Sequence, residues 1–285
     1  MPVEGDTLAG YVLGRVLGRG GSGVVHLAQQ RSDGAWLALK LLTAGAALDS
    51  IERAELRARF LQEAEVAKRL QHPDIVAIHA AGETAGALWL AMELVPGRSL
   101  ERYVQPPYLL PPPVVLGIVI RVARALAHAH AMGVVHRDVK PSNVIVDLAS
   151  DSVKLGDFGT ARLHDGSRTR TELLLGTPAY MAPEQLAGAA ADARSDLYTL
   201  GVMLFELLSG RRPHESASMG ELLRQVASEP APDLRTLRPE MPASLADTVA
   251  RLLAKRPGDR HADANVLADA LVRARLHTLG ADGVQ

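Results

Sequence analysis

The sequence lacks cysteine, carries a net charge of only −1 and has no long apolar run. Without cysteine there can be no disulfide, thiolate zinc site or cysteine nucleophile, and a reducing compartment is compatible with that. The near-zero charge offers no electrostatic attraction to nucleic acid or to an anionic membrane. Its most apolar stretches, "VVLGIVI" and "LGVMLFELLS", are shorter than a membrane span. We therefore expect a cytoplasmic protein with no nucleic-acid partner and no membrane segment in this chain.

The composition is that of an ordinary globular protein. Its 285 residues, 47% hydrophobic and 22% charged, suffice for one large domain or two lobes. The opening "MPVEGDTLAGYVLGR" lacks the cationic start and apolar run of a signal peptide. Both a stand-alone protein and an excised domain stay open.

Strand signals dominate the first third of the chain, and helix signals dominate the remainder. Residues 11–20, 23–30, 36–42, 74–82 and 87–95 indicate strands, with a helix over about 51–70 between the third and fourth. After "PG" at 96–97, helical patterns cover about 114–132, 193–209, 218–228, 244–254 and 263–276. This order predicts an α+β fold of two lobes joined near 95–98, with 277–285 as a short tail.

Three glycines, Gly18, Gly20 and Gly23, stand in G-x-G-x-x-G spacing. A strand precedes them and another follows, whereas a dinucleotide-binding fingerprint requires a helix after the glycines. A glycine-rich hairpin can lay backbone N–H groups over phosphates because no side chain blocks the approach. The spacing alone fits a plain hairpin equally well.

Two charged residues fall at apolar positions of the first lobe. Lys40 lies in the strand "WLALKLL", where an ammonium needs an anion or must reach solvent. On a helical wheel, Glu63 falls in the apolar stripe, whereas Glu65 faces solvent. The stripe consists of Leu56, Phe60, Val66, Ala67 and Leu70. Buried charges cost much less as a pair than alone, so we expect Lys40 to pair with Glu63. Two unrelated surface charges are the alternative.

Residues 134–147, "VVHRDVKPSNVIVD", place a charge cluster between two valine-rich runs of the kind that form buried strands. His136, Arg137, Asp138, Lys140 and Asn143 make up the polar part. Charges between core-like segments cost desolvation energy unless they are paired or bind something. The members of the cluster are therefore expected to be paired or to bind something, with a polar turn as the alternative.

Taken together, these segments resemble the eukaryotic-like serine/threonine protein kinases, especially those of bacteria. The glycine loop, "LALK", "RFLQEAE", "HRDVKPSN", "GDFG" and "APE" stand in the family's order, and the similarity covers about residues 11–276. The resemblance implies a protein kinase domain over 11–276, with a strand-rich N-lobe at 11–95, a helical C-lobe at 96–276 and an ATP cleft between them. It also implies ATP-dependent phosphorylation of serine and threonine hydroxyls on protein substrates.

The resemblance assigns catalytic roles to four residues. Phosphoryl transfer requires positioning and charge neutralisation more than covalent help from the protein. Asp138 matches the base that accepts the proton of the substrate hydroxyl, and Lys140 matches the lysine that steadies the γ-phosphate and marks Ser/Thr specificity. Lys40 and Glu63 match the ion pair of the N-lobe. His136 is expected to support the loop rather than to act as an acid or base.

ATP and magnesium are the implied cofactors, with manganese as an alternative metal. Asn143 and Asp157 match the metal ligands, and oxygen donors suit that hard cation. Met92 matches the gatekeeper, although a core methionine fits its chemistry equally. The backbone of Glu93 and Val95 would bond the adenine edge. The implied ATP-binding set is Leu17, Gly18, Gly20, Gly23, Val25, Ala38, Lys40, Met92, Glu93 and Val95.

Structural parts of the family are also matched. Asp196 resembles the aspartate that braces the catalytic loop from a buried helix. Glu184 and Arg260 resemble the ion pair that anchors the end of the activation segment. Thr177 matches a threonine that bonds near the catalytic residues.

The activation segment, residues 157–184, suggests regulation. Arg137 matches the arginine that receives a phosphothreonine, and Thr169 and Thr171 match the autophosphorylated pair of bacterial relatives. A phosphate adds charge suited to arginine and can order such a loop. Solvated threonines without a role are the alternative. Relatives also use dimerisation for activation, which leaves a homodimer open as a partner.

Two rival functions share this fold. A pseudokinase predicts the loss of a key residue, but Lys40, Asp138, Asn143 and Asp157 are all present. A small-molecule phosphotransferase, such as an antibiotic kinase, lacks an activation segment with "GTPAYMAPE". The sequence therefore favours a protein kinase.

Overall fold

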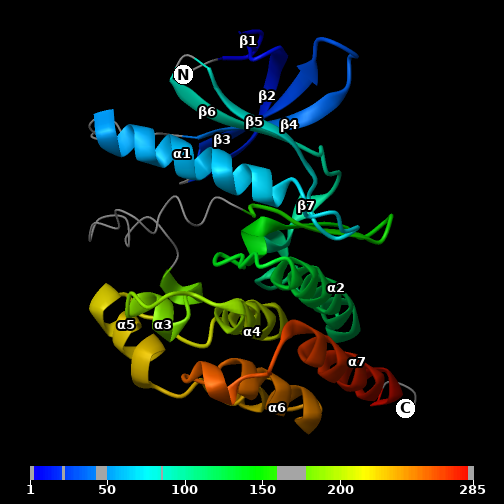
Figure 1. Cartoon of the computed structure of the whole chain (residues 1–285). Helices are drawn as coiled ribbons and strands as arrows, with labels where there is room; N and C mark the ends of the chain where they lie inside the picture. The colour runs from blue at the N-terminus through cyan, green and yellow to red at the C-terminus, as the bar shows by residue number, and fades with distance from the viewer. Residues whose placement is uncertain (1–2, 21–22, 43–49, 85, 159–177, 282–285) are drawn as a thin grey trace. The chain divides into compact units, whose positions relative to one another are not determined.

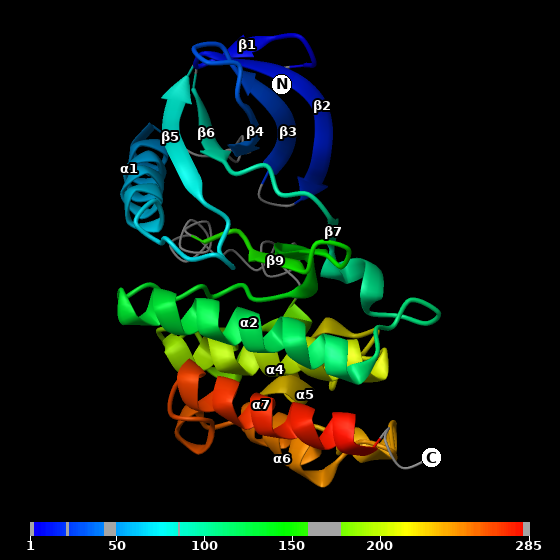
Figure 2. The same cartoon turned by 90° about the vertical axis from the view of Figure 1, so that its right-hand side faces the viewer.

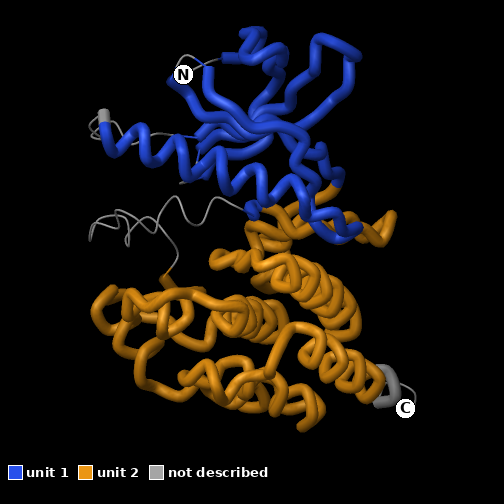
Figure 3. The backbone as a smooth tube through the Cα atoms, viewed as in Figure 1, with its two compact units in different colours: residues 1–96, 157–176 blue, residues 97–156, 177–285 orange. Residues whose placement is uncertain are grey.

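A computed structural model describes residues 3–20, 23–42, 50–84, 86–158 and 178–281 (Figure 1). The chain divides into two compact units (Figure 3). The first comprises residues 1–96 and 157–176, and the second comprises residues 97–156 and 177–285.

The first unit is built on a six-stranded antiparallel sheet with the order β1-β2-β3-β4-β6-β5. Its strands are β1 (Thr7–Leu8), β2 (Tyr11–Gly20), β3 (Gly23–Gln30), β4 (Trp36–Leu42), β5 (Ile78–Thr84) and β6 (Ala87–Met92). Helix α1 (Ser50–Ala67) lies beside β5 (Figure 2).

Successive side chains of β6 point to opposite faces of the sheet, and both faces are packed. Leu88 and Leu90 join Phe60 of α1 in one hydrophobic cluster. Ala91 joins Leu13 and Leu39 in another, formed by the remaining strands. The two clusters fix the register of β4 and β6, because a slip of one residue would exchange their faces.

The second unit is mainly helical. It contains α2 (Pro112–Ala131), α3 (Pro183–Leu186), α4 (Ala193–Ser209), α5 (Met219–Ser228), α6 (Ala243–Leu252) and α7 (Ala264–Ala281). Helix α4 is its centre, since every residue from Ser195 to Leu208 is buried. A small antiparallel sheet of β7 (Arg98–Ser99), β8 (Val144–Asp147) and β9 (Ser152–Leu155) adjoins the helices.

Helix α2 is long and apolar enough by length and composition to cross a membrane, and it is the one such helix within the described residues. In this structure, however, 56% of its most apolar window is buried inside the protein. Ten of its residues, from Val115 to Ala129, lie in the core. That burial is characteristic of the core helix of a globular domain.

Most element boundaries follow the sequence pattern. The strand expected over 74–82 begins only at Ile78, and the one expected over 87–95 ends at Met92. Two other differences have a local reason. Val134 and Val135 form no strand, because Gly133 adopts a φ of +74° after α2 and the Val134 N–H bonds the carbonyl of Ala129. Residues 277–281 continue α7, where the sequence indicates a tail. The reason is packing: Thr278 is buried, and His277 Nδ1 lies 3.0 Å from Ser244 Oγ.

Candidate active site

The glycine-rich hairpin joins β2 and β3, with Gly20 opposite Gly23. Gly23 has a φ of +142°, and a Cβ there would lie 2.0 Å from the carbonyl oxygen of Leu41. The fold itself therefore requires Gly23. A Cβ at Gly18 or Gly20 would meet nothing within 4 Å. Those two glycines leave open backbone that a phosphate could approach.

Lys40 forms its ion pair with Asp157 rather than with Glu63. Lys40 Nζ donates to Asp157 Oδ1 at 2.8 Å, and the lysine side chain is only 3% exposed. Across the described part of the chain, no ion pair joins Lys40 to Glu63, so the predicted pair is absent in this structure. The aspartate of "GDFG" satisfies the buried ammonium instead, as a buried charge requires.

The helical wheel predicts the exposure of α1 well at three positions and fails at one. Glu63 is partly buried and Glu65 is exposed, where it pairs with Lys68 at 3.0 Å. Phe60 is buried at 1% exposure. Val66, however, is 40% exposed and does not belong to the apolar stripe. It lies at the edge of the stripe, whereas Ala67 and Leu70 beside it are buried.

A small apolar cluster gathers the predicted adenine-binding side chains. Ala38 and Met92 are register partners on β4 and β6, and both are buried. Val25 and Val95 pack against them. Val76 completes the cluster. It precedes β5 within the stretch 74–82 where the sequence predicts a strand, and no motif marks it as a site residue.

The backbone after β6 supplies polar groups next to this cluster. The N–H of Glu93 donates to the carbonyl of Ala77 at 2.8 Å. Any bond from Glu93 to the adenine edge must therefore come from its carbonyl. Leu17, which is the first residue of the predicted ATP-binding set, lies on β2 and is 37% exposed.

The catalytic loop, residues 136–143, collects its polar side chains around Asp138. Asp138 Oδ2 forms an ion pair with Lys140 Nζ at 2.7 Å and accepts a hydrogen bond from Asn143 Nδ2 at 3.1 Å. No described residue donates to Oδ1, and the side chain is 45% exposed. Oδ1 is thus the oxygen available to a hydroxyl proton.

His136 has a structural role in this loop. Its Nε2 lies 2.8 Å from the carbonyl oxygen of Gly156, which can only accept, so Nε2 carries the hydrogen. Its Nδ1 accepts from the N–H of Asp138 at 3.3 Å. Both ring nitrogens are engaged with backbone, which agrees with the predicted supporting role.

Asp196 is fully buried in α4 and holds the catalytic loop. Its Oδ1 accepts from the Arg137 N–H at 2.6 Å, and its Oδ2 accepts from the His136 N–H at 2.8 Å. His130 Nε2 also lies 2.8 Å from Oδ2. Arg137 has a φ of +68°, a costly conformation for a non-glycine residue that these bonds help to impose.

Asp157 shares this backbone strain, with a φ of +64°. Strained non-glycine residues of this kind cluster at functional sites. The Nδ2 group of Asn143 donates to the carbonyl and carboxylate oxygens of Asp138, which leaves Oδ1 as the acceptor end of its amide. An amide oxygen and a carboxylate are ligands that fit magnesium. Within the described residues, no cluster of three or more His, Cys, Asp or Glu side chains forms another metal site.

Glu184 and Arg260 form a bidentate ion pair, with oxygen–nitrogen distances of 2.6 and 2.8 Å. Arg260 is 1% exposed and stacks on the ring of Tyr198 at 4.9 Å. Burial acts to raise the pKa of Glu184, but the hydrogen bonds from Arg260 and Ser195 outweigh it and hold that pKa below its ordinary value. The pair joins α3 to the segment between α6 and α7.

Three predicted residues lie outside the described residues, namely Thr169, Thr171 and Thr177. The remaining predicted site residues are all described. Lys40 and Asp157 come together in the first unit. Asp138, Lys140 and Asn143 come together in the second, with Asp196 bonded to the same loop.

Known proteins share the sequence of this chain over most of its length. The family described as "Protein kinase domain" matches residues 11–272. The serine/threonine-protein kinase PknJ of Mycobacterium tuberculosis is 40% identical over 277 residues, which cover 95% of this chain and 46% of that protein. PknF of the same species is 39% identical over 269 residues, covering 92% of this chain and 56% of that protein. This chain thus spans about half the length of these relatives.

Solved structures of kinase domains resemble this chain over nearly its whole length. The crystal structure of the PknI kinase domain of Mycobacterium tuberculosis superposes with a TM-score of 0.77 at 36% sequence identity. The match covers 96% of this chain and 100% of that one.

Proposed function

This chain belongs to the protein kinase domain family, and we propose that it transfers the γ-phosphate of ATP to serine and threonine hydroxyls of protein substrates in bacterial signalling. The observation that carries the proposal is the catalytic loop. Asp138, Lys140 and Asn143 are bonded to one another there, and Asp196 holds the backbone from a buried helix. The catalytic domain occupies residues 11–276.

In this proposal each side chain has a distinct task. Asp138 Oδ1 accepts the proton of the attacking hydroxyl, since Oδ2 is already bonded to Lys140 and Asn143. Lys140 can steady the transferred phosphate from its place beside Asp138. Lys40 holds the nucleotide phosphates, and the open backbone at Gly18 and Gly20 receives them.

Asn143 and Asp157 would hold magnesium. When bound, that ion neutralises charge on the phosphates and orients them. The side chain of Asp157 is 29% exposed and bonds Lys40 through Oδ1. The ring of adenine would lie on Ala38, Val25 and Met92.

The rearrangement of Lys40 is part of the proposal. Kinase catalysis requires both a Lys–Glu pair in the N-lobe and an Asp–metal contact. The structure pairs Lys40 with Asp157, so the Lys–Glu pair is not formed in it. Activation would transfer Lys40 from Asp157 to Glu63 and free the aspartate for magnesium.

Autophosphorylation of Thr169 and Thr171 is the proposed route to that active state. The side chain of Arg137 would then bind the phosphate of a phosphothreonine. Incubation with ATP and magnesium, followed by mass spectrometry of the chain and of a generic basic protein, tests transfer and site together. We expect phosphate on both threonines and on the basic protein. Activity should fall in the Thr169→Ala/Thr171→Ala double variant and change little in Ser167→Ala. Full activity in the double variant, with both threonines unmodified in the active enzyme, would reject this regulation.

A further inference from the structure

Gln185 joins α3 to the catalytic loop. It is the residue that directly follows "APE" in the sequence, and it is partly buried. Its Nε2 group donates to the carbonyl oxygen of Arg137 at 3.0 Å, and its Oε1 atom accepts from the N–H of Ala182 at 2.9 Å. Gln185 and Arg137 are 48 positions apart in the chain. The same amide therefore caps the start of its own helix and holds the backbone of a distant loop.

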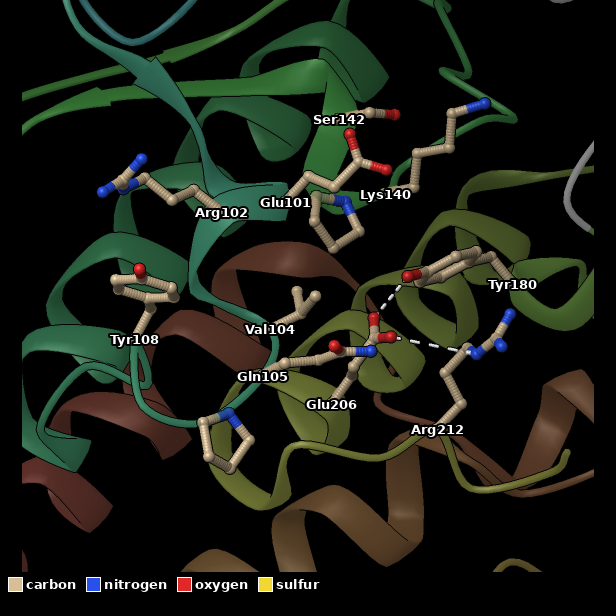
Figure 4. Close-up of a pocket in the computed structure, with 12 residues that line it drawn as sticks. Glu101, Arg102, Val104, Gln105, Tyr108, Lys140, Ser142, Tyr180, Glu206 and Arg212 are labelled. Carbon is tan, nitrogen blue, oxygen red and sulfur yellow. Dashed lines mark hydrogen bonds and ion pairs between the residues drawn. The ribbon is translucent and has the colours of Figure 1, made fainter.

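The segment that carries Gln185 is itself tied to the core of the helical unit. Its neighbour Glu184 forms the bidentate ion pair with the buried Arg260. Shortly before α3, Tyr180 donates its hydroxyl to Glu206 of the central helix α4. Figure 4 shows Tyr180 directed at Glu206, within a pocket that both side chains line. Gln185 thus reaches the catalytic loop from a support that is fixed on its own account.

Gln185 acts on the peptide group that directly precedes the proposed base. The carbonyl of this peptide belongs to Arg137, and its N–H belongs to Asp138. Gln185 holds the carbonyl, and His136 Nδ1 accepts from the N–H at 3.3 Å. Because a peptide group is planar, hydrogen bonds at its two edges restrict its rotation. That rotation helps to set where the carboxylate of Asp138 points.

The conformation of Arg137 makes this support significant. Arg137 has a φ of +68°, and a non-glycine residue keeps such a conformation only where its surroundings impose it. Asp196 of α4 accepts from the N–H of Arg137 at 2.6 Å, while Gln185 of α3 donates to its carbonyl. Two helices therefore hold the two polar ends of one strained residue. Loss of the Gln185 bond would remove one of these two constraints.

We propose that Gln185 is a positioning residue for phosphoryl transfer. Its hydrogen bond orients the peptide between Arg137 and Asp138, so that Asp138 Oδ1 is directed at the substrate hydroxyl. A misplacement of about 1 Å can lower a rate about 10²-fold, which makes the orientation of this peptide consequential. The inference rests on the proposed kinase function and adds to it a residue outside the catalytic loop. In this role Gln185 acts through Asp138 and not on the reacting atoms.

The chemistry of the amide provides variants that separate this role from helix capping. Gln185→Glu keeps an oxygen for the N–H of Ala182, but an ionised carboxylate has no hydrogen for the carbonyl of Arg137. Gln185→Met keeps the length of the side chain and removes both bonds. Gln225→Met is the matched control, because Gln225 lies on α5 of the same unit and bonds the side chain of Glu221 instead of the loop.

The test measures two quantities for wild type and these variants. The first is the single-turnover rate of phosphoryl transfer to a basic protein, which separates the transfer step from product release. The second is the Kd of ATP–magnesium. Rates are expressed per nucleotide-binding site, titrated in the same preparation at a temperature well below the Tm of each variant. Unfolded protein therefore does not contribute to the comparison.

We expect Gln185→Glu and Gln185→Met to lower the transfer rate about tenfold to hundredfold, because the base loses its orientation. The Kd of ATP–magnesium should stay within about twofold of wild type, since a residue that acts on the transfer step leaves nucleotide binding intact. Arg137 and Ala182, which Gln185 bonds, do not belong to the predicted ATP-binding set. Gln225→Met should match wild type in both quantities.

Three results would overturn the proposal. Wild-type turnover in Gln185→Glu would show that the cap at Ala182 alone explains the residue. A Gln185→Glu protein that does not fold, or that loses nucleotide binding in parallel with rate, would show a general structural role. A rate loss in Gln225→Met as large as that in the Gln185 variants would show that the effect is not specific to the loop.

Failure of the kinase function itself would look different. A wild-type enzyme that transfers no phosphate contradicts the proposed function, and the role of Gln185 in transfer falls with it. An active wild type together with an equally active Gln185→Glu rejects the role of Gln185 alone and leaves the kinase function standing.

Discussion

Three buried charged residues, Lys40, Asp196 and Arg260, each have a defined partner. Lys40, Asp196 and Arg260 are at most 2% exposed. Lys40 bonds a carboxylate, Asp196 bonds two backbone N–H groups, and Arg260 bonds Glu184 together with three carbonyls. Burial of a charge is tolerable only with such pairing. These contacts therefore identify the residues whose replacement should be most costly.

Arg260→Met should strongly destabilise the helical unit, because Glu184 would stay buried without its partner. Removing one member of a buried pair costs about 3–5 kcal/mol, equivalent to roughly 6–20 °C in Tm for a protein of this size. Thermal unfolding checks this, with Arg256→Met as the exposed control, expected within about 0.5 kcal/mol of wild type. Equal Tm values for the two variants would contradict a supporting role for the pair.

The penalty for Arg260→Met should also depend on pH. The folded-state pKa of Glu184 lies below its ordinary value of 4.5, so its stabilisation is present above that value. It is lost as the pH falls through the folded-state pKa. The difference in unfolding free energy between wild type and Arg260→Met should therefore be largest near neutral pH and should shrink in acid.

Substitutions around Lys40 test the proposed change of partner. Lys40→Met should abolish most transfer, and Glu63→Gln should reduce it less, since Lys40 can still reach the phosphates. Glu65→Gln is the matched control, because Glu65 is exposed and pairs with Lys68. Initial rates of phosphoryl transfer give the comparison. If Glu65→Gln were far more damaging than Glu63→Gln, the assignment of Glu63 as the inward-facing glutamate that acts with Lys40 would be wrong.

Local chemistry accounts for where the elements begin and end. Helix α4 starts after Asp192, whose carboxylate accepts from the N–H groups of Arg194 and Ser195, and it stops at Gly210 with a φ of +77°. Such caps, together with hydrophobic period, are readable in sequence. The bounds predicted for β2, β3, β4 and α4 therefore agree with the structure. Packing decided the extent of α7, and no local signal marks it.

Close contact between α4 and α6 makes Gly201 irreplaceable. A Cβ at Gly201 would lie 2.6 Å from Leu252 Cβ, which has no freedom to move aside. Gly201→Ala should cost about 1–3 kcal/mol by overpacking. Gly220→Ala, in α5 and with nothing within 4 Å, should instead stabilise by about 0.5–1 kcal/mol. Urea denaturation of both variants measures the free energy of unfolding. A change of the same sign in both would contradict the close contact between Gly201 and Leu252.

For the whole molecule, sequence reasoning predicted the fold class because the two halves differ in hydrophobic period and the motifs stand in order. Family membership and the kinase fold are confirmed by the comparisons. Which anion pairs with Lys40 could not be predicted, since Glu63 and Asp157 compete and tertiary geometry decides. The surroundings of Glu206 could not be predicted either. A glutamate within an apolar helix gives no indication that Tyr180 and Glu101 line the same pocket.

The central claim, that Asp138 is the base of a phosphoryl transfer, is tested most directly by the turnover of Asp138→Asn. The substitution keeps the size of the side chain, and Asp196 still holds the loop backbone. Phosphate transferred to a basic protein should be measured by mass spectrometry, with enzyme shown to be free of contaminating kinase. The account predicts retained ATP–magnesium binding and a rate about 10² to 10⁴ times lower than wild type. Turnover close to wild type would contradict it.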